Sequence, residues 1–289
     1  MIRDDLRLLR GAIDLHTHST PDLIARSIDD IELAKQAARA GMRGIVLKSH
    51  FSMTQFRADL VKKVVDGLEV FGGVVLNHSV GGLNPHAVDV VLKGGGKIIW
   101  MPTKSAKNHL AHMGADHVER TTRGALLPVE GISPIDRRGA ISPEVEEILN
   151  LIAEANAILA TGHLSVEESK VLVKEARNVG VKKILINHPE FIVVDMSVDD
   201  QIEMAKAGAY LEHTWPAVDY GRIVETIRAT GVDHSVIATD LGQITNPVPT
   251  EGFRVYIQRL LRAGIRPSEI EVMVKRNPET LLDLPGSLS

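Results

Sequence analysis

Eight short apolar runs alternate with amphipathic segments along the chain, and this alternation constrains the fold more than any other feature of the sequence. Each run is nearly continuous in Val, Ile, Leu or Ala, which is typical of a parallel strand buried on both faces. The runs are AIDLH at 12–16, GIVLKSH at 44–50, FGGVVLNH at 71–78, KIIWMP at 97–102, AILATGH at 157–163, KILINH at 183–188, AYLEH at 209–213 and SVIATD at 235–240.

The segments between the runs have helical periodicity, clearest at 28–40, 166–179 and 202–208. Several of them end in glycine just before the next run, as expected for a helix C-terminus, because glycine accepts the left-handed conformation without a steric clash. Alternating strands and helices predict an α/β protein with parallel βαβ units. Eight units in one chain favour a (β/α)8 TIM barrel, a single domain over residues 1–289. Further helices are expected near 251–263 and 268–275. No GxGxxG motif follows the first run, which disfavours a dinucleotide-binding fold.

One connection is much longer than the others. The segment 103–142 follows the fourth predicted strand, and an insertion at this end of a barrel usually covers or completes the active site. We interpret it as a lid, or alternatively as an ordinary solvated loop. Its cationic residues that could attract an anionic substrate include Lys104, Lys107, Arg120 and Arg123. Its histidines are His109, His112 and His117, which we expect to be solvated rather than to form a separate ion site.

Composition excludes several function classes. The chain has no Cys, so it has neither disulfides nor a cysteine nucleophile. Its net charge of −4 and its low aromatic content of 3% argue against a nucleic-acid partner. The sequence contains neither a signal peptide nor an apolar stretch long enough to span a membrane, so we expect a cytoplasmic protein without a membrane partner. Histidine is unusually frequent, with 12 residues, which directs attention to metal binding.

Histidines and one aspartate stand at the ends of the predicted strands. In a parallel barrel these ends meet at one face, so the side chains should gather in one bowl. They are His16, His18, His50, His78, His163, His188, His213 and Asp240. In the HTH motif, His16 and His18 alternate along a strand and therefore point the same way, as needed to bind one ion. A lone His-x-His is weak evidence, but its combination with His163, His188 and Asp240 is specific for a metal site.

These motifs resemble the amidohydrolase superfamily of metal-dependent hydrolases. The resemblance rests on HTH after the first run, TGH after the fifth, NH after the sixth and TDLGQ after the eighth, and RNPETLLDL is similar to the ending of that superfamily. LKSH, LNHSVGGLNP and WMPT look more narrowly like an uncharacterised amidohydrolase-like branch. The resemblance implies that His16, His18 and Asp240 hold one divalent ion and that His163 and His188 hold a second. It also implies that Asp240 handles the proton of the attacking water.

The superfamily often bridges its two metals with a carboxylated lysine from the fourth strand. Here Lys104 lies beyond Pro102, whereas Lys48 ends the second run, level with the bowl. A buried ammonium is costly, and carboxylation would turn Lys48 into an anionic bridge. We therefore favour carboxylated Lys48 as a metal ligand over Lys104. A mononuclear site, with Lys48 as a substrate clamp, stays open.

The reaction predicted from these residues is hydrolysis of an amide, lactone or ester bond of a small substrate, either neutral or anionic. A divalent ion, with zinc preferred over manganese or nickel, would activate water, and Asp240 would act as general base. His213 and His50 are candidate donors to the developing oxyanion. His78 and Lys104 are candidate substrate contacts. The alternative for His78 is a purely structural role, with its side chain hydrogen-bonded in the turn that follows it.

Three other functions fit parts of the pattern. A single zinc could drive a decarboxylation, with His188 as acid or base instead of ligand. A phosphoesterase of the PHP type also has an HxH on its first strand, but its further ligands have no counterparts here. A metal-binding barrel without catalysis is the alternative from another class. Barrels of this size often form homo-oligomers, which the sequence leaves open.

Overall fold

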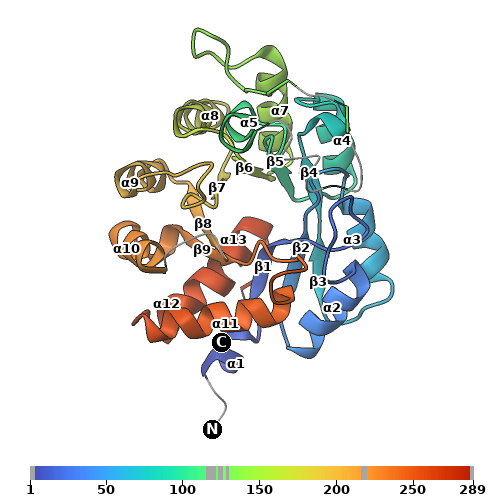
Figure 1. Cartoon of the computed structure of the whole chain (residues 1–289), viewed down its shortest axis with the longest axis vertical. Coiled ribbons are helices and arrows are strands. Elements are labelled where there is room, and N and C mark those ends of the chain that lie inside the picture. The colour runs from blue at the N-terminus through green and yellow to red at the C-terminus, as the bar shows by residue number, and fades with distance from the viewer. Residues whose placement is uncertain (1–3, 115–121, 123–125, 128–129, 216–219, 287–289) are drawn as a thin grey trace.

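The strands are arranged in a ring and most of the helices lie outside it, as Figure 1 shows for the computed structural model. The structure describes residues 4–114, 122, 126–127, 130–215 and 220–286. The strands are β1 (Ile13–Thr17), β2 (Gly44–Leu47), β3 (Glu69–Phe71), β4 (Gly73–Val75), β5 (Ile98–Trp100), β6 (Ile158–Ala160), β7 (Lys183–Asn187), β8 (Tyr210–Thr214) and β9 (Ser235–Ala238).

Helices follow most strands, and all but a few of them pack against the outside of the ring (Figure 1). They are α1 (Asp4–Leu9), α2 (Asp30–Arg39), α3 (Gln55–Lys62), α4 (Pro85–Lys93), α5 (Lys107–Met113), α7 (Pro143–Glu154), α8 (Val166–Asn178), α9 (Val198–Lys206), α10 (Tyr220–Thr230), α11 (Pro249–Arg262), α12 (Pro267–Glu271) and α13 (Asn277–Leu282). A short π-helix, Val272–Arg276, joins α12 to α13.

All strand pairs are parallel, and they follow the order of the chain. One sheet has the order β1-β2-β3 and the other the order β4-β5-β6-β7-β8-β9. Only Gly72 separates β3 from β4, and a Cβ there would lie 2.5 Å from the backbone of Thr54, so the close approach of α3 requires glycine. At the other end of the order, a parallel bridge joins Thr17 to Leu241, beyond β9.

Helix α13 covers the amino ends of the strands. Leu281 and Leu282 are each only 1% exposed and belong to the apolar cluster inside the ring, together with Ile13 and Trp100. The polar contacts of α13 also go to strand starts, because the Asn277 amide donates to the carbonyl of Ser235 at a distance of 2.7 Å. The amino end of the ring is therefore filled with apolar side chains, and the carboxyl end is left for chemistry.

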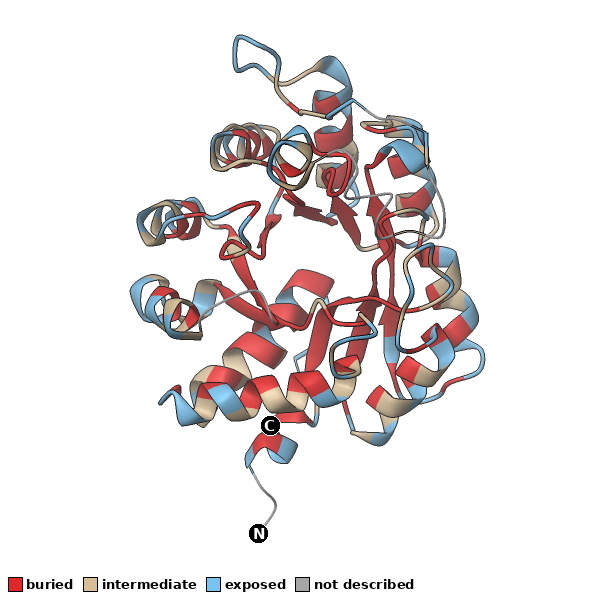
Figure 2. Cartoon of the chain, viewed as in Figure 1, coloured by how far each residue is buried: buried red, intermediate tan, exposed pale blue. Residues whose placement is uncertain are grey.

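Burial follows this arrangement. Figure 2 shows the strands buried over nearly their whole length and the helices buried mainly on the faces that they turn toward the ring. Two further apolar clusters fill the layer between strands and helices, one containing Leu47, Phe253 and Tyr256, the other Val91 and Ile186. Strands covered on both sides carry nearly continuous apolar sequence, which explains the eight runs.

The predicted α/β fold class with parallel strands is confirmed: each of the eight apolar runs contains a strand, with the third run overlapping both β3 and β4. The helix ends at Gly41, Gly180, Gly208 and Gly231 all have positive φ, as predicted. Some boundaries differ. Helix α9 begins at Val198, earlier than the periodicity suggested, since Ser197 caps it by accepting from the amide of Asp200.

The segment 103–142 is not simply a solvated loop. It contains α5, and a parallel bridge between Ala106 and Ile132 holds its described ends together. His117, Arg120 and Arg123, which we considered as lid residues, lie outside the described residues.

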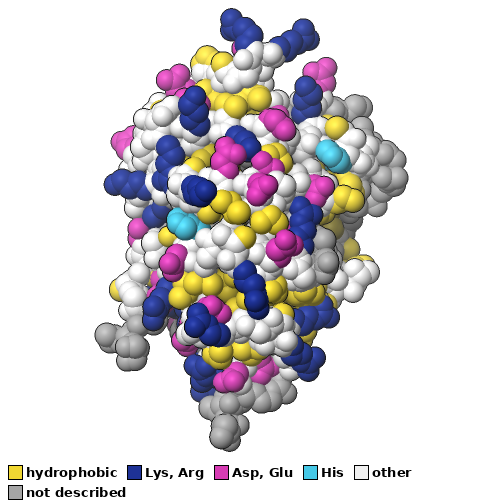
Figure 3. Space-filling view, turned by 90° about the vertical axis from the view of Figure 1, so that its left-hand side faces the viewer, with side chains coloured by type: hydrophobic (Ala, Val, Ile, Leu, Met, Phe, Trp, Pro, Cys, Tyr) yellow, Lys and Arg dark blue, Asp and Glu magenta, His cyan; other side chains and the backbone are white. Residues whose placement is uncertain are grey.

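Figure 3 shows the flank that carries α8, α9 and α10, where Lys and Arg side chains alternate with Asp and Glu. No one sign of charge dominates this face. Within the described ranges, no helix combines the length and apolar character needed to cross a bilayer.

We expect Leu282→Ala to destabilise the fold by about 3 kcal/mol, because it removes a buried side chain from the closed end of the ring. Chemical denaturation followed by circular dichroism measures this loss. Leu60→Ala is the matched control, since Leu60 is 65% exposed and its truncation should change stability by less than about 0.5 kcal/mol. Equal effects of the two variants would contradict the packing role of α13.

Candidate metal centre and active-site cavity

His16, His18 and Asp240 converge where β1 ends and β9 has just ended. Oδ1 of Asp240 lies 3.0 Å from Nε2 of His16 and 3.0 Å from Nε2 of His18. The backbone holds the group together, because the amide of Asp240 donates to the carbonyl of His16 at 2.8 Å. Within the described part of the chain, these are the only three His or carboxylate residues close enough together to hold one ion. The first ligand set predicted from sequence is therefore gathered at one point.

Glu212 on β8 fixes the orientation of His16. Its Oε2 lies 3.0 Å from Nδ1 of His16 and accepts a hydrogen bond from the side-chain amide of Asn187 at 2.7 Å. A carboxylate can only accept, so Nδ1 donates to Glu212 and Nε2 is the nitrogen that faces Asp240. Burial alone would lower the pKa of His16, but Asp240 and Glu212 raise it to about 9. The position therefore favours a cation, either a proton or a metal ion.

Lys48 lies directly beside this group. Its Nζ is 2.9 Å from Nε2 of His16 and 5.5 Å from the ring centre of Trp100. The side chain is 1% exposed, and burial lowers the pKa of Lys48 to about 8 although Asp240 and Glu212 oppose the shift. The sequence placed Lys48 level with the ligands, and the structure agrees. Lys104 also lines the cavity, with its pKa lowered to about 8 by burial and by Arg26.

His163 and His188 form a second pair next to the first group. Their ring centres are 4.9 Å apart, and the His188 ring is 6.0 Å from that of His16. Burial lowers the pKa of both, to about 4 for His188, so both imidazoles are neutral, as ligation requires. Nδ1 of His188 is buried and has no hydrogen-bond partner among the described residues. The pair can hold a second ion if another ligand joins it.

His109 corrects one expectation. We expected the histidines of the insertion to be solvated, and His112 is exposed, but His109 is 2% exposed. It is carried by α5, and its Nδ1 lies 2.7 Å from Nδ1 of His163. One of these two nitrogens must donate and the other accept, so the tautomers of His109 and His163 depend on each other. The sequence shows no periodic signal for this contact, because it depends on how α5 packs.

The three histidines with weaker support from the sequence, His50, His78 and His213, lie in different surroundings in the structure. His50 lines the cavity, stacks on His18 at 5.0 Å between ring centres, and is fixed by Thr103 Oγ1, 2.8 Å from its Nδ1. His78 is exposed and its Nε2 lies 2.7 Å from the carbonyl of Glu130, so it is not among the residues that line the cavity. The turn that follows β4 directs it outward.

His213 also lies away from the cavity. Its Nδ1 is 2.8 Å from Oε1 of Glu190, and both side chains are buried. Adjacent residues of a strand point to opposite faces, and Glu212 already points to His16 inside the ring, so His213 points outward. The oxyanion role proposed for His213 from sequence therefore has no support in this position. The functional side chain of the AYLEH run is Glu212, which the sequence analysis missed.

A cavity of about 410 Å³ opens over His18 and Asp240 at the carboxyl ends of the strands. It falls in the size range of small-molecule sites. Its lining residues that the sequence analysis did not single out include Arg26, Phe191, Ile192, Thr214, Trp215, Gln243 and Asn246. Most of these lie on loops, where neither strand ends nor periodicity gives a signal.

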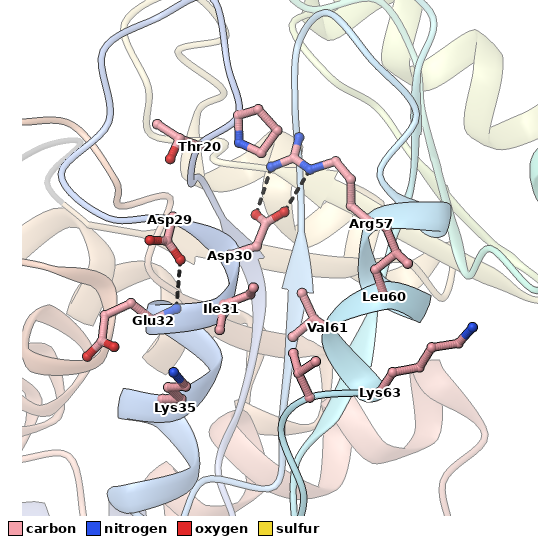
Figure 4. A pocket seen from close by; sticks show the side chains of 12 residues that line it. Thr20, Asp29, Asp30, Ile31, Glu32, Lys35, Arg57, Leu60, Val61 and Lys63 are labelled. Carbon is pink, nitrogen blue, oxygen red and sulfur yellow. Dashed lines mark hydrogen bonds and ion pairs between the residues drawn. The ribbon is translucent and has the colours of Figure 1, made fainter.

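A larger groove of about 610 Å³ lies between α2 and α3 (Figure 4). The ion pair between Arg57 and Asp30, 2.7 Å apart, closes one end, and Leu60 and Val61 form part of its wall. None of the described residues that line it is a histidine. The smaller cavity over His18 and Asp240 is therefore the candidate active site, because it joins a pocket to side chains that can bind a metal.

Residues 11–212 match the model of a family of unknown function, DUF6282. The chain belongs to this family. No protein of curated function matches the sequence. Family membership alone therefore supplies no activity.

Solved structures show what fold the family has. An amidohydrolase from Pseudomonas aeruginosa matches with a TM-score of 0.63 at 13% identity, covering 96% of this chain and 97% of that one. A 2,6-dihydroxybenzoate decarboxylase from Rhizobium matches with a TM-score of 0.57 at 10% identity, covering 95% and 99%. A variant of an organophosphorus hydrolase from Deinococcus radiodurans matches with a TM-score of 0.57 at 11% identity, covering 96% and 94%. The chain thus has the fold of the amidohydrolase superfamily, as its motifs predicted.

We expect Glu212→Gln to weaken zinc binding by about 10- to 100-fold, because Nδ1 of His16 loses its anionic acceptor. Competition with a chromophoric chelator measures the affinity. Glu190→Gln is the matched control, since Glu190 makes the equivalent contact with His213 on the other face of β8. If both variants weaken zinc binding alike, a general loss of stability is responsible and the orienting role of Glu212 is wrong.

Proposed function

We propose that the chain is a metal-dependent hydrolase that cleaves an amide, lactone or ester bond of a small molecule. The observation that carries the proposal is the position of Asp240 Oδ1, 3.0 Å from Nε2 of both His16 and His18, at the base of a small-molecule cavity. Two imidazoles and a carboxylate are a donor set typical of zinc and related divalent ions. The tautomer of His16, set by Glu212, fits this role.

His16, His18 and Asp240 would hold the first ion, and His163 and His188 a second, with zinc as the preferred metal and manganese or nickel as alternatives. When bound, such an ion supplies Lewis acidity and lowers the pKa of water toward about 7. Asp240 accepts the proton of the attacking water at its carboxylate and returns it to the leaving group. Burial raises the pKa of Asp240, but His16 and His18 lower it by more. The net pKa lies well below the usual value, so the carboxylate is ionised and can accept a proton.

His50 is placed to contact the substrate. Thr103 Oγ1 accepts from the amide of Asn77 at 2.8 Å, and its own hydroxyl proton can be donated to Nδ1 of His50. Nε2 of His50 then carries a proton and can donate to a developing oxyanion in the cavity. Lys104 provides a second donor on the same wall.

Lys48 is proposed as the bridge to the second ion. Its lowered pKa of about 8 leaves a substantial neutral fraction near neutral pH. The neutral amine can add to carbon dioxide, forming an N–C bond and releasing one proton, which gives a carbamate anion. This anion would supply the ligand that His163 and His188 lack. Its position beside His16 favours Lys48 over Lys104 for this role.

A non-hydrolytic enzyme with one metal, such as a decarboxylase, is the second candidate. The observation that favours it is that only His16, His18 and Asp240 form a three-ligand group among the described residues. In that case His188 would act as acid or base. The number of ions per chain separates this candidate from a binuclear hydrolase.

Asp240→Asn should lower turnover by about a thousandfold or more in the zinc-loaded protein, because the amide cannot accept the proton. Turnover is measured on a panel of nitrophenyl esters, lactones and amides. His78→Ala, an exposed residue away from the cavity, should retain full activity. Full activity of the Asp240 variant would refute the assigned mechanism, and an inactive wild-type protein on the whole panel would refute the proposed reaction.

Lys48→Gln should reduce bound zinc from two equivalents per chain to one, whereas Lys104→Gln should keep both. Elemental analysis counts the ions. A carbamate resonance in carbon-13 NMR, after incubation with labelled bicarbonate, should appear in the wild type and in the Lys104 variant only. One equivalent in the wild type, without that resonance, would contradict the bridge and favour the mononuclear candidate.

A further inference from the structure

Arg26 is fixed on the wall of the cavity by two separate connections. The loop that carries it, between β1 and α2, is joined to the loop after β9, because the amide of Ser27 donates to the carbonyl of Gly242 at 2.9 Å. Arg26 itself bridges to Gln243 through the backbone. Asp22 then holds the guanidinium, accepting at Oδ2 from Nε at 3.2 Å and from Nη2 at 3.1 Å. Both side chains are at most 2% exposed.

This guanidinium lies next to the metal-binding group. Its Nη2 is 3.3 Å from Nδ1 of His18, whose Nε2 faces Asp240. A group bound by Arg26 would therefore sit one imidazole ring away from the reacting centre. That spacing suits an anchor for a part of the substrate that does not react.

The charge of the cavity wall is unbalanced toward positive. Arg26 and Lys104 both line it, and among the described lining residues Asp240 is the only carboxylate. Burial lowers the pKa of Lys104 most, and repulsion from Arg26, which lines the same cavity, lowers it further. A monoanion placed between them would relieve this repulsion, and a guanidinium matches the geometry of a carboxylate.

Another part of the wall is apolar. Phe191, Ile192 and Trp215 line it, and the ring of Phe191 is 5.3 Å from that of His188. Trp215 is 7% exposed, whereas Ile192 is 69% exposed and forms the outer edge. These side chains offer a surface that can cover a flat, apolar group of ring size.

We propose that the cavity selects a substrate with a carboxylate and an apolar, ring-sized group. Arg26 and Lys104 bind the carboxylate, and Phe191, Ile192 and Trp215 cover the ring. This inference deepens the proposed function, on which it rests for the bond that reacts, but the recognition step needs no turnover. Arg26 is then a specificity-determining residue, and Asp22 positions it.

Benzoate is the test ligand because it has both features, and three probes each change one of them. Benzamide keeps the ring without the charge, acetate keeps the charge without the ring, and phenylphosphonate carries more charge and a tetrahedral head. Calorimetry and the fluorescence of Trp215 measure binding, in the metal-free and in the zinc-loaded protein. We expect benzoate to bind at least about tenfold more tightly than each other probe, a difference of about 1.4 kcal/mol.

Arg26→Gln should weaken benzoate binding at least about tenfold and leave benzamide binding unchanged. Since this variant strands the buried Asp22 charge, the double variant Asp22→Asn with Arg26→Gln tests the same loss without an unpaired carboxylate. Lys206→Gln, an exposed cation on α9 away from the cavity, is the matched control and should bind benzoate normally.

Equal binding of benzoate and benzamide, preference for phenylphosphonate, or unchanged benzoate binding in the double variant would each overturn the inference. The proposed hydrolase would survive all three if neutral esters are turned over. Benzoate binding that depends on Arg26, in a protein that hydrolyses nothing on the panel, would support the inference and refute the hydrolase.

Discussion

The contact between Asp240 and the two histidines of β1 is the interaction on which the candidate site depends. It joins residues from opposite ends of the chain, and it forms only because the segment after β9 runs alongside β1. The backbone hydrogen bond from Asp240 to the carbonyl of His16 belongs to the same pairing. The arrangement of the strands and the chemistry therefore share one structural requirement, and a change that separates β9 from β1 would remove both.

The sequence predicted the strands well because a buried parallel strand can be recognised from its apolar composition. A strand buried on both faces must be apolar throughout, and each run ends where a polar ligand begins. The same property hides the direction of each side chain. In an apolar run without alternation, nothing distinguishes the inward residue from the outward one, so AYLEH suggested His213 when the inward side chain is Glu212. At β1, the HTH pattern left no such ambiguity, and His16 and His18 were predicted correctly to lie together.

The remaining site residues could not be predicted because they depend on tertiary packing of irregular segments. His109 reaches His163 only because α5 folds back over the strand ends, and no local pattern encodes that approach. Arg26 lies in a short loop, and its role depends on Asp22 and on the loop after β9. The prediction that His78 contacts the substrate lost its support for a related reason. Its position after a strand was correct, but the turn directs its side chain to the carbonyl of Glu130. The candidate ligands lie at strand ends and could be predicted from the sequence, whereas the residues that line the cavity lie mostly on loops and could not.

Buried charge explains how such a site can exist before an ion arrives. Asp240 and Glu212 place two carboxylates in a region with little solvent, which would oppose folding if nothing balanced them. Lys48, whose Nζ lies 2.9 Å from Nε2 of His16, and His16, whose pKa is raised to about 9, share positive charge at this point. The chain thus supplies its own cations where a divalent ion would bind, so binding must displace a proton from His16 or change Lys48 chemically. Carboxylation of Lys48 achieves that change, because it replaces a competing cation with a ligand. The apolar end of the ring under α13 contributes stability independently of the metal, which leaves the ionisable end free to be arranged for binding and reaction.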